Sequence, residues 1–310
     1  MKILSRPKKN AEEYGKWAVN PYLGCTGGCL YCYLKEGPGA KTLGGSTPTL
    51  KAGVVNEEHA CLVAMTEILE NEEQIKKDGG LFFSFTTDPL LPGTHDVCLT
   101  IAAWATNHEI PVTMLTKCAS FYNTGGAPDL PFFDCIQHIH KYIWAPDVDP
   151  TVQYITLGWT LTGHDELEPG ADPNAKRIEA MSRLSAAGFK TWASIEPVID
   201  FDSSFCMIQQ ALDAGCQHFK IGLMTKCTKV CRRGFTLGGK TFEPYEPAQC
   251  LAFVQDVMQA TRDRATVYWK QSFRDFIGGT GKHRLFTDDE LHKIFDDYPN
   301  AVGKDWTMFK

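Results

Sequence analysis

The chain has 310 residues, of which 43% are hydrophobic and 22% are charged, and its formal net charge is −6. This composition is that of a globular protein and excludes a disordered chain. The acidic balance excludes nucleic-acid binding by the charge of the whole surface, although a local basic cleft remains open. At roughly 150 residues per domain, the length fits two domains or one large α/β barrel.

Helix and strand patterns alternate along most of the chain. Apolar residues at helical spacing predict helices at Glu57–Lys77, Asp96–Asn107, Leu130–His140, Asn174–Ala187, Phe205–Ala214, Pro247–Thr261 and Thr287–Phe295. Short apolar runs predict strands at Leu81–Phe85, Pro111–Leu115, Tyr154–Trp159, Lys190–Ile195, His218–Leu223 and Ala265–Trp269. This repetition predicts an α/β fold with a parallel sheet, in which catalytic residues lie at the carboxyl ends of the strands.

Several segments depart from this alternation. Residues 20–35 hold the first group of cysteines, and residues 36–53 are rich in Gly, Pro, Ser and Thr and predict a long loop. Residues 224–245 form an irregular insertion with several basic residues. We expect a main unit at 1–275 and a C-terminal helical extension at 276–310 that packs on it.

The chain contains 12 cysteines. The N-terminal residues lack the apolar core of a signal peptide, and no apolar run reaches the length of a transmembrane helix. We therefore expect a cytoplasmic protein without a membrane partner, in which thiols stay reduced. Each cysteine is then either a core residue or a metal ligand.

Cys25, Cys29 and Cys32 form the most specific motif, with the spacing C-x3-C-x2-C. The glycines around them allow the backbone to turn tightly enough to aim all three sulfurs inward. A structural zinc site would need a fourth ligand, and no other cysteine or histidine lies nearby. Three thiolates on a four-iron cluster would leave one iron open to a substrate or cofactor. Three buried thiols, or a zinc loop completed by a distant ligand, are the alternatives.

The residues around this motif resemble the cluster-binding loop of the radical S-adenosylmethionine enzymes. The match includes the lead Asn-Pro-Tyr-Leu-Gly-Cys at 20–25 and the aromatic Tyr31 before the third cysteine. Within that superfamily the sequence is similar to the branch related to spore photoproduct lyase and to phage-associated radical enzymes of unassigned function. Three later motifs extend the resemblance over about residues 17–275: Arg177-Ile178, Ser194-Ile195-Glu196-Pro197 and Tyr268-Trp269-Lys270-Gln271.

The resemblance implies a partial TIM-type barrel of about six β/α units with an N-terminal cluster loop. It implies that Cys25, Cys29 and Cys32 hold a [4Fe–4S] cluster whose open iron binds S-adenosylmethionine. An electron, from a one-electron reductant such as flavodoxin or ferredoxin, would cleave this cofactor and release a 5′-deoxyadenosyl radical that abstracts hydrogen from the substrate. The protein would supply orientation and keep water away.

The resemblance also implies cofactor-binding residues at the strand ends. Thr86, Thr87 and Asp88 would meet the amino group of the cofactor, because hydroxyl and carboxylate oxygens accept hydrogen bonds from an ammonium. An ordinary turn before Pro89 is the alternative.

Four more residues complete the expected cofactor-binding set. Lys117 would pair with the carboxylate or ribose of the cofactor, Thr160 matches a serine that meets it in related lyases, and Glu196 would face ribose hydroxyls or substrate. Tyr31 belongs to the same set through its place in the cysteine motif. A solvated rim lysine, an ordinary strand threonine and a carboxylate near a helix start are the alternatives.

Two lysines are expected inside apolar strands. An unpaired charge would be costly at Lys220 and Lys270, so each should point into a polar cavity or pair with a carboxylate. A structural lysine that extends its ammonium to solvent is the equal alternative.

One position departs from the lyase pattern. In spore photoproduct lyase a cysteine directly precedes the Ser/Thr-Asp strand end and supplies the hydrogen atom that closes the reaction. Phe85 takes this place here, which argues against thymine-dimer repair by the same route. Cys118 is a candidate substitute donor, and a buried structural thiol is the alternative.

The insertion holds a second pair of cysteines, Cys227 and Cys231, which could bind an auxiliary metal with Cys216 and Cys250. Its basic residues could hold phosphates, and the aromatic residues after them could stack a base; the residues are Lys226, Lys229, Arg232, Arg233, Lys240, Phe235, Phe242 and Tyr245. A solvated loop with incidental thiols is the alternative. The other cysteines are expected in the core: Cys61, Cys98, Cys118, Cys135, Cys206, Cys216 and Cys250.

These observations favour a radical S-adenosylmethionine enzyme that acts on a nucleic acid or nucleotide. Radical modification of a peptide or protein is the second hypothesis, which an auxiliary cluster would favour. A non-catalytic zinc-binding module is the third. The open three-cysteine site and the strand–helix alternation count against this last one.

Overall fold

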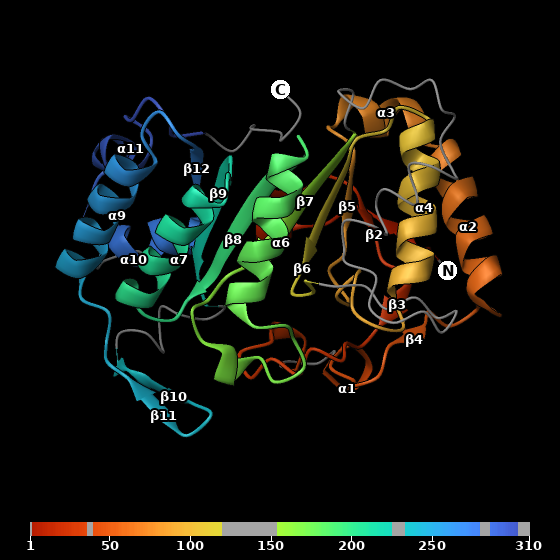
Figure 1. The fold of residues 1–310 in the computed structure, drawn as a ribbon, viewed down its shortest axis with the longest axis horizontal. Coiled ribbons are helices and arrows are strands. Elements are labelled where there is room, and N and C mark those ends of the chain that lie inside the picture. Colours follow the sequence, from red (N-terminus) through yellow and green to blue (C-terminus); the bar gives the residue numbers. More distant parts are fainter. Residues whose placement is uncertain (1, 36–39, 120–153, 225–232, 280–285, 303–310) are drawn as a thin grey trace.

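The computed structural model describes residues 2–35, 40–119, 154–224, 233–279 and 286–302 (Figure 1). The helix predicted at 130–140 lies outside these residues. So do Cys135, both cysteines of the insertion and three of its basic residues, namely Cys227, Cys231, Lys226, Lys229 and Arg232.

The described residues form a main sheet of eight strands in the order β1-β2-β5-β6-β7-β8-β9-β12. β1 is antiparallel to β2, and every other neighbouring pair is parallel. The predicted α/β fold with a parallel sheet is therefore confirmed. The strands are β1 (Leu4–Ser5), β2 (Ala18–Val19), β5 (Leu81–Phe83), β6 (Val112–Thr116), β7 (Ile155–Thr160), β8 (Lys190–Val198), β9 (His218–Leu223) and β12 (Thr266–Trp269).

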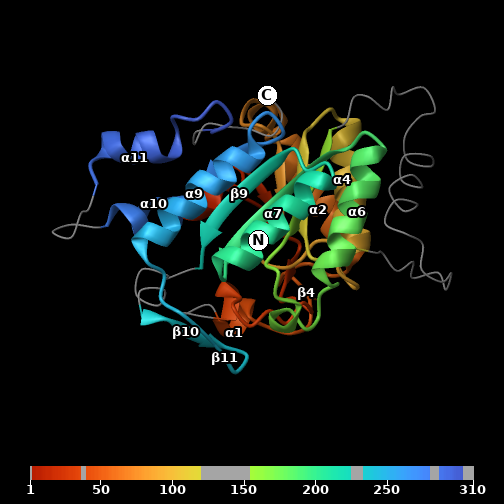
Figure 2. The same ribbon diagram turned by 60° about the vertical axis from the view of Figure 1, so that its left-hand side comes forward.

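Long helices lie along the outer side of the curved sheet (Figures 1 and 2). Every residue of β7 and of β9 is buried, because side chains on both faces of these strands are covered. This double burial explains why the strands read as apolar runs in the sequence. The helices are α2 (Glu57–Leu69), α4 (His95–Asn107), α6 (Asn174–Ala186), α7 (Phe201–Asp213) and α9 (Pro247–Thr261).

Several of the shorter elements, among them two small strand pairs, lie near the carboxyl ends of the strands, toward the lower edge of Figure 1. Two small antiparallel pairs, β3 with β4 and β10 with β11, lie outside the main sheet. The shorter elements are η1 (Lys9–Glu13), β3 (Tyr22–Leu23), η2 (Tyr33–Lys35), α1 (Ala40–Leu43), β4 (Thr49–Leu50), α3 (Glu72–Lys77), η3 (Asp165–Leu167), β10 (Phe235–Leu237), β11 (Lys240–Phe242), α10 (Gln271–Gly278) and α11 (Asp288–Phe295).

Helix α11 packs against β12 and α10 through aromatic contacts. Phe295 of α11 is fully buried, with its ring 5.8 Å from that of Trp269 and 6.4 Å from that of Phe273. The boundary expected at residue 275 falls inside α10. Among the described residues, no helix has the length and apolar character needed to cross a membrane.

Two predicted helices have different bounds in the structure. The helix expected at 57–77 divides into α2 and α3, because the Asn71 side chain donates to the carbonyl oxygen of Glu67 at 2.8 Å and competes with the helical pattern. Helix α7 begins four residues earlier than expected. Its N-cap is Asp200, whose side chain accepts a hydrogen bond from the backbone N–H of Ser203 at 2.8 Å.

Two strand ends also differ from the prediction. Glu196 and Pro197 lie within β8 rather than after it, and the register with β9 shifts between Ile195 and Val198. Proline cannot donate to the ladder, so the strand continues through an irregularity at this point. Lys270 lies just after β12, at the N-cap of α10.

Candidate functional site

The cluster loop, residues 20–35, carries three free thiols at the carboxyl-end edge of the sheet. Cys29 is buried, and Cys25 and Cys32 are partly exposed. The sulfurs of Cys25 and Cys29 lie 3.4 and 3.7 Å from the point that a Cβ on Gly27 would occupy. A side chain at position 27 would therefore fill the space that both sulfurs face.

Burial raises the pKa of two of these thiols. It raises the pKa of Cys25 to about 11, and it raises the pKa of Cys29 as well. The positive charge of Lys117 acts in the opposite direction on both. Thiolates at these positions therefore need additional positive charge, which a metal centre would supply.

Among the residues that the structure describes, no three Cys, His, Asp or Glu side chains are grouped as ligands of a single metal ion. In a four-iron cluster each cysteine binds a different iron, so three such cysteines need not surround a single ion.

Asp88 joins the ends of two strands beside the first cysteine. Its Oδ1 accepts hydrogen bonds from the hydroxyl of Thr116 at 2.6 Å and the backbone N–H of Leu90 at 3.0 Å. Its Oδ2 accepts from the backbone N–H of Lys117 at 2.7 Å. The carboxylate therefore already binds three donors of the chain, and it holds the backbone of Lys117 in place.

The two threonines before Asp88 differ in their partners. Thr86 donates from Oγ1 to the carbonyl oxygen of Tyr22 at 2.5 Å. Thr87 is only 6% exposed, and its Oγ1 has no hydrogen-bond partner in the structure. A buried hydroxyl without a partner is unfavourable, so Thr87 is the member of this group that is open to a ligand.

Lys117 directs its ammonium toward the cluster loop. Its Nζ lies 5.8 Å from the ring centroid of Tyr31. Burial alone would lower the pKa of Lys117, but the charges of Cys29, Glu168 and Asp88 outweigh burial and raise it. The side chain is therefore a cation at the edge of the site.

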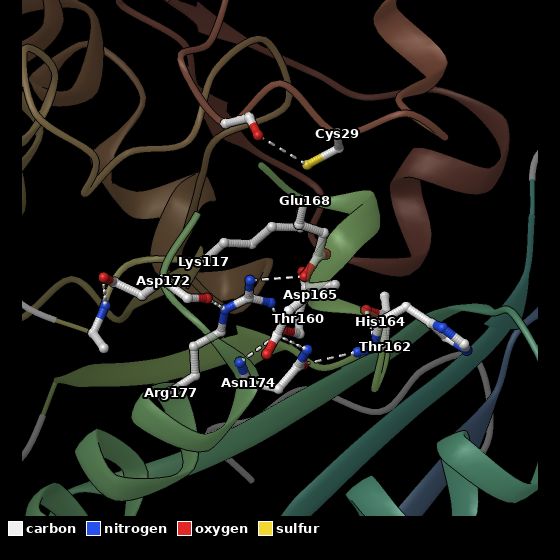
Figure 3. Close-up of polar contacts among 12 residues, drawn as sticks. Cys29, Lys117, Thr160, Thr162, His164, Asp165, Glu168, Asp172, Asn174 and Arg177 are labelled. Atoms are coloured by element: carbon white, nitrogen blue, oxygen red, sulfur yellow. Dashed lines mark hydrogen bonds and ion pairs between the residues drawn. The ribbon is translucent and has the colours of Figure 1, made fainter. Parts of the chain in front are cut away.

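Tyr31, Glu168 and Arg177 form a second buried group, which we call the loop clamp. Figure 3 shows Glu168 and Arg177 of this group. The Tyr31 hydroxyl donates to Oε1 of Glu168. Oε2 of Glu168 lies 2.7 Å from Nη2 of Arg177, close enough for an ion pair but without the alignment of a hydrogen bond. Both charged side chains are fully buried. Nη1 of Arg177 donates to the carbonyl oxygen of Thr160 at 2.8 Å, so this strand end is part of the same network.

Glu168 was not predicted as a site residue, and Arg177 was noted only as part of a motif. Glu168 lies in a loop with no regular pattern, so the sequence carries no signal for it. The signal for Arg177 was its place on the inner face of α6, where an arginine is fully buried. Charged residues are almost never fully buried unless they are paired, which would have called for a carboxylate partner.

Glu196 belongs to a separate group, the N-terminal cluster, made of Glu13, Tyr14, Glu196, Lys220 and Lys270. Oε2 of Glu196 accepts from Nζ of Lys270 at 2.6 Å and from the Tyr14 hydroxyl. Lys270 also lies 3.7 Å from Oε2 of Glu13, and Lys220 donates to the backbone carbonyl of Glu13 at 2.6 Å. Lys270 thus pairs with a carboxylate, as one of the two readings of the sequence predicted.

Tyr33 and Phe85 lie between the cysteines and the N-terminal cluster. The Tyr33 hydroxyl donates to the carbonyl oxygen of Phe85 at 2.5 Å, and the Phe85 ring lies 6.1 Å from that of Tyr14. Burial raises the pKa of Tyr33, and the charges of Cys32, Glu196 and Cys25 add to this effect. The two groups therefore face a common region.

The described part of the insertion is a β10–β11 hairpin that covers the cluster loop. A Cβ on Gly238 would lie 2.9 Å from Leu30 and 3.2 Å from Leu167. Phe235 and Tyr245 are buried, and the Tyr245 hydroxyl donates to the carbonyl oxygens of Val198 and Ile199 at 2.6 and 2.7 Å. The expectation that these two rings stack a base is therefore wrong, because they pack in the interior. Of the basic residues, Lys240 binds Glu166 at 2.6 Å and Arg233 is exposed.

The other described cysteines follow the prediction with two departures. Cys98, Cys118, Cys216 and Cys250 are buried. Cys61 is partly buried and Cys206 is exposed, so Cys206 is not a core residue. Cys206 lies at an exposed position of α7, and single apolar residues are common on protein surfaces.

Comparison with known proteins identifies the fold. No protein-family model matches the sequence, and no curated protein matches it. A solved structure of a spore photoproduct lyase variant, in which one tyrosine is replaced by phenylalanine, is similar with a TM-score of 0.55 and 14% identity over 85% of this chain and 79% of that chain. A double variant of the lyase with bound AdoMet and dinucleoside spore photoproduct has a TM-score of 0.50 and 14% identity, over 98% of this chain and 80% of that chain. The chain therefore has the partial TIM-type barrel fold of spore photoproduct lyase, as the sequence resemblance implied.

Proposed function

We propose that this protein is a radical S-adenosylmethionine enzyme that holds a [4Fe–4S] cluster through Cys25, Cys29 and Cys32. The observation that carries the proposal is the placement of three free thiols on one short loop, at the carboxyl-end edge of a lyase-type barrel. Catalytic residues of such barrels lie at this edge.

The residues present fit the two groups. The space that Gly27 leaves between two sulfurs suits a cluster, and the buried thiols need the positive charge that iron supplies. The unpartnered hydroxyl of Thr87 and the cation of Lys117 suit the amino and carboxylate groups of the cofactor. When bound, the two groups supply a one-electron reduction of the sulfonium that ends in hydrogen abstraction from the substrate.

The chain's own residues would bind and orient the cofactor and would shield the site from water. Lys117 would pair with the cofactor carboxylate, and Thr87 would accept a hydrogen bond from the cofactor ammonium. The ring of Tyr31 would form one wall of the cofactor site. Thr160 and Glu196 would lie further along the strand ends, toward the ribose or the substrate. The β10–β11 hairpin would keep water from the cysteines, because its turn already lies against Leu30.

For the substrate we propose a nucleic acid or nucleotide. The support is the similarity in fold to a lyase that was solved with a dinucleoside bound. The reaction itself would differ in its last step, because Phe85 stands where that lyase carries the hydrogen-donating cysteine. The Phe85 backbone is held by Asn20 and Tyr33, so its place in the site is well defined.

Cofactor cleavage tests the activity. Anaerobically reconstituted protein, reduced with dithionite or with a flavodoxin or ferredoxin system, is expected to convert S-adenosylmethionine to 5′-deoxyadenosine. Cys29→Ala should abolish this product, and Cys206→Ala should leave it unchanged because Cys206 is exposed on α7, outside the cluster loop. Protein that binds a full cluster and forms no 5′-deoxyadenosine under these conditions would contradict the proposal.

Substrate class is tested by stimulation of the same reaction. Short DNA, RNA and dinucleotides are expected to increase the rate of 5′-deoxyadenosine formation. When the substrate is labelled with deuterium, the label should appear in the 5′-deoxyadenosine. Stimulation by peptides alone would reject a nucleic-acid substrate and leave the radical activity standing.

A further inference from the structure

The loop between β7 and α6, residues 161–173, is fastened to the cluster loop at several points. The backbone N–H of Leu30 donates to the carbonyl oxygen of Leu167 at 2.9 Å, and that of Gly170 donates to Gly27 at 3.1 Å. A Cβ on Gly170 would lie 2.1 Å from the carbonyl oxygen of Thr26, so only glycine permits this approach. The Tyr31–Glu168 hydrogen bond adds a side-chain contact between the same two loops.

Arg177 connects this contact to the sheet. Its Nε donates to the carbonyl oxygen of Asp172 at 2.7 Å, and its Nη1 donates to that of Thr160 at 2.8 Å. Its remaining nitrogen lies 2.7 Å from Glu168. One planar guanidinium thus fixes a strand end, the loop and the carboxylate that holds Tyr31 (Figure 3).

The same loop also fixes the segment that carries Lys117. The backbone N–H of Asp172 donates to the carbonyl oxygen of Lys117 at 3.1 Å, and Oδ2 of Asp172 accepts from the backbone N–H of Ala119 at 2.6 Å. Figure 3 shows the Lys117 side chain extended toward Glu168. Tyr31 and Lys117 come from different parts of the chain, and this loop is attached to both.

A fully buried ion pair is an expensive way to stabilise a fold. Desolvation of the two charges is costly, and apolar residues of similar volume are often equally stable or more stable. The pair does provide directed contacts, since Glu168 accepts a hydrogen bond from the Tyr31 hydroxyl while Arg177 donates to two backbone carbonyl oxygens. Orientation of these groups is therefore the effect that apolar replacements could not reproduce.

We propose that Glu168 and Arg177 are positioning residues that set the placement of Tyr31 relative to Lys117, and thereby the affinity of the site for the sulfonium cofactor. This inference rests on the proposed function. Neither residue needs to touch the reacting atoms, because both act through the groups that they hold.

The main test replaces the pair with apolar residues in the double variant Glu168→Leu/Arg177→Met. Such a variant removes both charges together and avoids leaving one of them buried without a partner. We expect it to fold and to retain its iron, to bind S-adenosylmethionine at least about tenfold more weakly, and to lose the change in the reduced-cluster EPR spectrum that cofactor addition produces in the wild type. Glu166→Gln, on the same loop but on its exposed side, is the matched control and should behave as wild type.

Two further variants sharpen the interpretation. Tyr31→Phe, which removes only the hydroxyl, should reproduce part of the loss in cofactor affinity. Glu168→Gln keeps the size and the acceptor for Tyr31 but removes the charge; it should give an intermediate loss, and it serves if the double variant does not fold. The proposal would be overturned if these variants bound the cofactor within twofold of the wild-type affinity and kept the wild-type EPR change on cofactor addition. The pair would then have a purely structural role.

Hydrogen exchange of the apoprotein separates this inference from the proposed function. The amides of residues 26–31 are expected to exchange faster in the double variant than in the wild type, whether or not any cofactor binds. If wild-type protein binds neither cluster nor cofactor, the proposed function fails. Faster exchange at residues 26–31 in the double variant would still show that the pair positions the segment that carries Tyr31. Unchanged exchange in a folded variant would reject the clamp itself.

Discussion

The loop clamp and the N-terminal cluster use the same kinds of groups in different surroundings. Each combines a tyrosine hydroxyl, a carboxylate and a basic side chain near the carboxyl ends of the strands. In the loop clamp both charged side chains are fully buried, whereas 23% of the Glu196 side chain is exposed in the N-terminal cluster. The first joins two loops beside the cysteines, and the second ties residues 13 and 14 to β8, β9 and α10. The comparison teaches that burial, rather than the identity of the groups, should decide how much each one matters.

The largest expected effect is that of removing one charge from the loop clamp. Arg177→Met removes the ion-pair partner of the buried Glu168 carboxylate, so we expect the free energy of unfolding to fall by about 3–5 kcal/mol. Lys270→Met, the matched change in the N-terminal cluster, should lower it by about 1–3 kcal/mol because water can reach Glu196. Urea unfolding of both variants measures the difference, and equal losses would show that burial does not separate the two groups.

The second effect is a pH dependence that belongs to the N-terminal cluster. Burial lowers the pKa of Lys220 to about 7, and the charge of Lys270 adds to this effect. In the unfolded chain the pKa of a lysine is about 10.4. Between pH about 7 and about 10, Lys220 therefore carries a proton in the unfolded state that it lacks in the folded state. The free energy of unfolding should therefore rise with pH from about 7 to about 10, by up to roughly 1.4 kcal/mol per pH unit.

Lys220→Met should remove this part of the slope in unfolding experiments across that pH range. Lys176→Met, at an exposed position on α6, is the control and should keep it. A slope that is the same in the wild type and in the Lys220 variant would show that the lysine keeps its charge in the folded protein.

A smaller effect is expected at Glu13, which fastens the N-terminal segment. Its Oε1 accepts from the Tyr268 hydroxyl at 2.9 Å and the backbone N–H of Gln271 at 2.8 Å. Glu13→Gln keeps an acceptor and removes the charge, so we expect a loss of about 1 kcal/mol. Hydrogen exchange should increase at residues 9–14 and stay unchanged at 26–31, with Glu12→Gln as the exposed control. Faster exchange at both segments would mean that the two groups are coupled.

The smallest effect is expected at the surface of the β7–α6 loop. Lys240 and Glu166 are 2.6 Å apart, but their side chains are 59% and 47% exposed. Lys240→Ala should lower the free energy of unfolding by less than about 0.5 kcal/mol, because exposed ion pairs contribute little. A loss above 1 kcal/mol in thermal or urea unfolding would show that the hairpin depends on this contact.

Local patterns were sufficient to predict the sheet and most of the helices. Strands β6, β7, β9 and β12 were predicted to within one residue at each end, because each coincides with a short, largely apolar run. The prediction was wrong where a single side chain changes the backbone, as at Asn71, Asp200 and Pro197. Those effects depend on hydrogen bonds that periodicity does not report.

The candidate site was predictable where a motif is contiguous. The cysteine motif and the strand-end residues Asp88 and Lys117 could be read from the chain, and the structure places them close together. Glu168 was missed because it becomes a partner of Tyr31 only through folding, with 137 positions of sequence between them. The structure also shows that Asp88 and Glu196 bind other parts of the chain, which sequence patterns could not reveal.

The central claim is that the three thiols hold a four-iron cluster, and metal analysis tests it most directly. Anaerobically reconstituted protein should contain about four irons and four sulfides per chain and absorb near about 400 nm, and Cys29→Ala should lose both features. Stoichiometric zinc with no bound iron, in wild-type protein that is folded and fully reduced, would contradict the account.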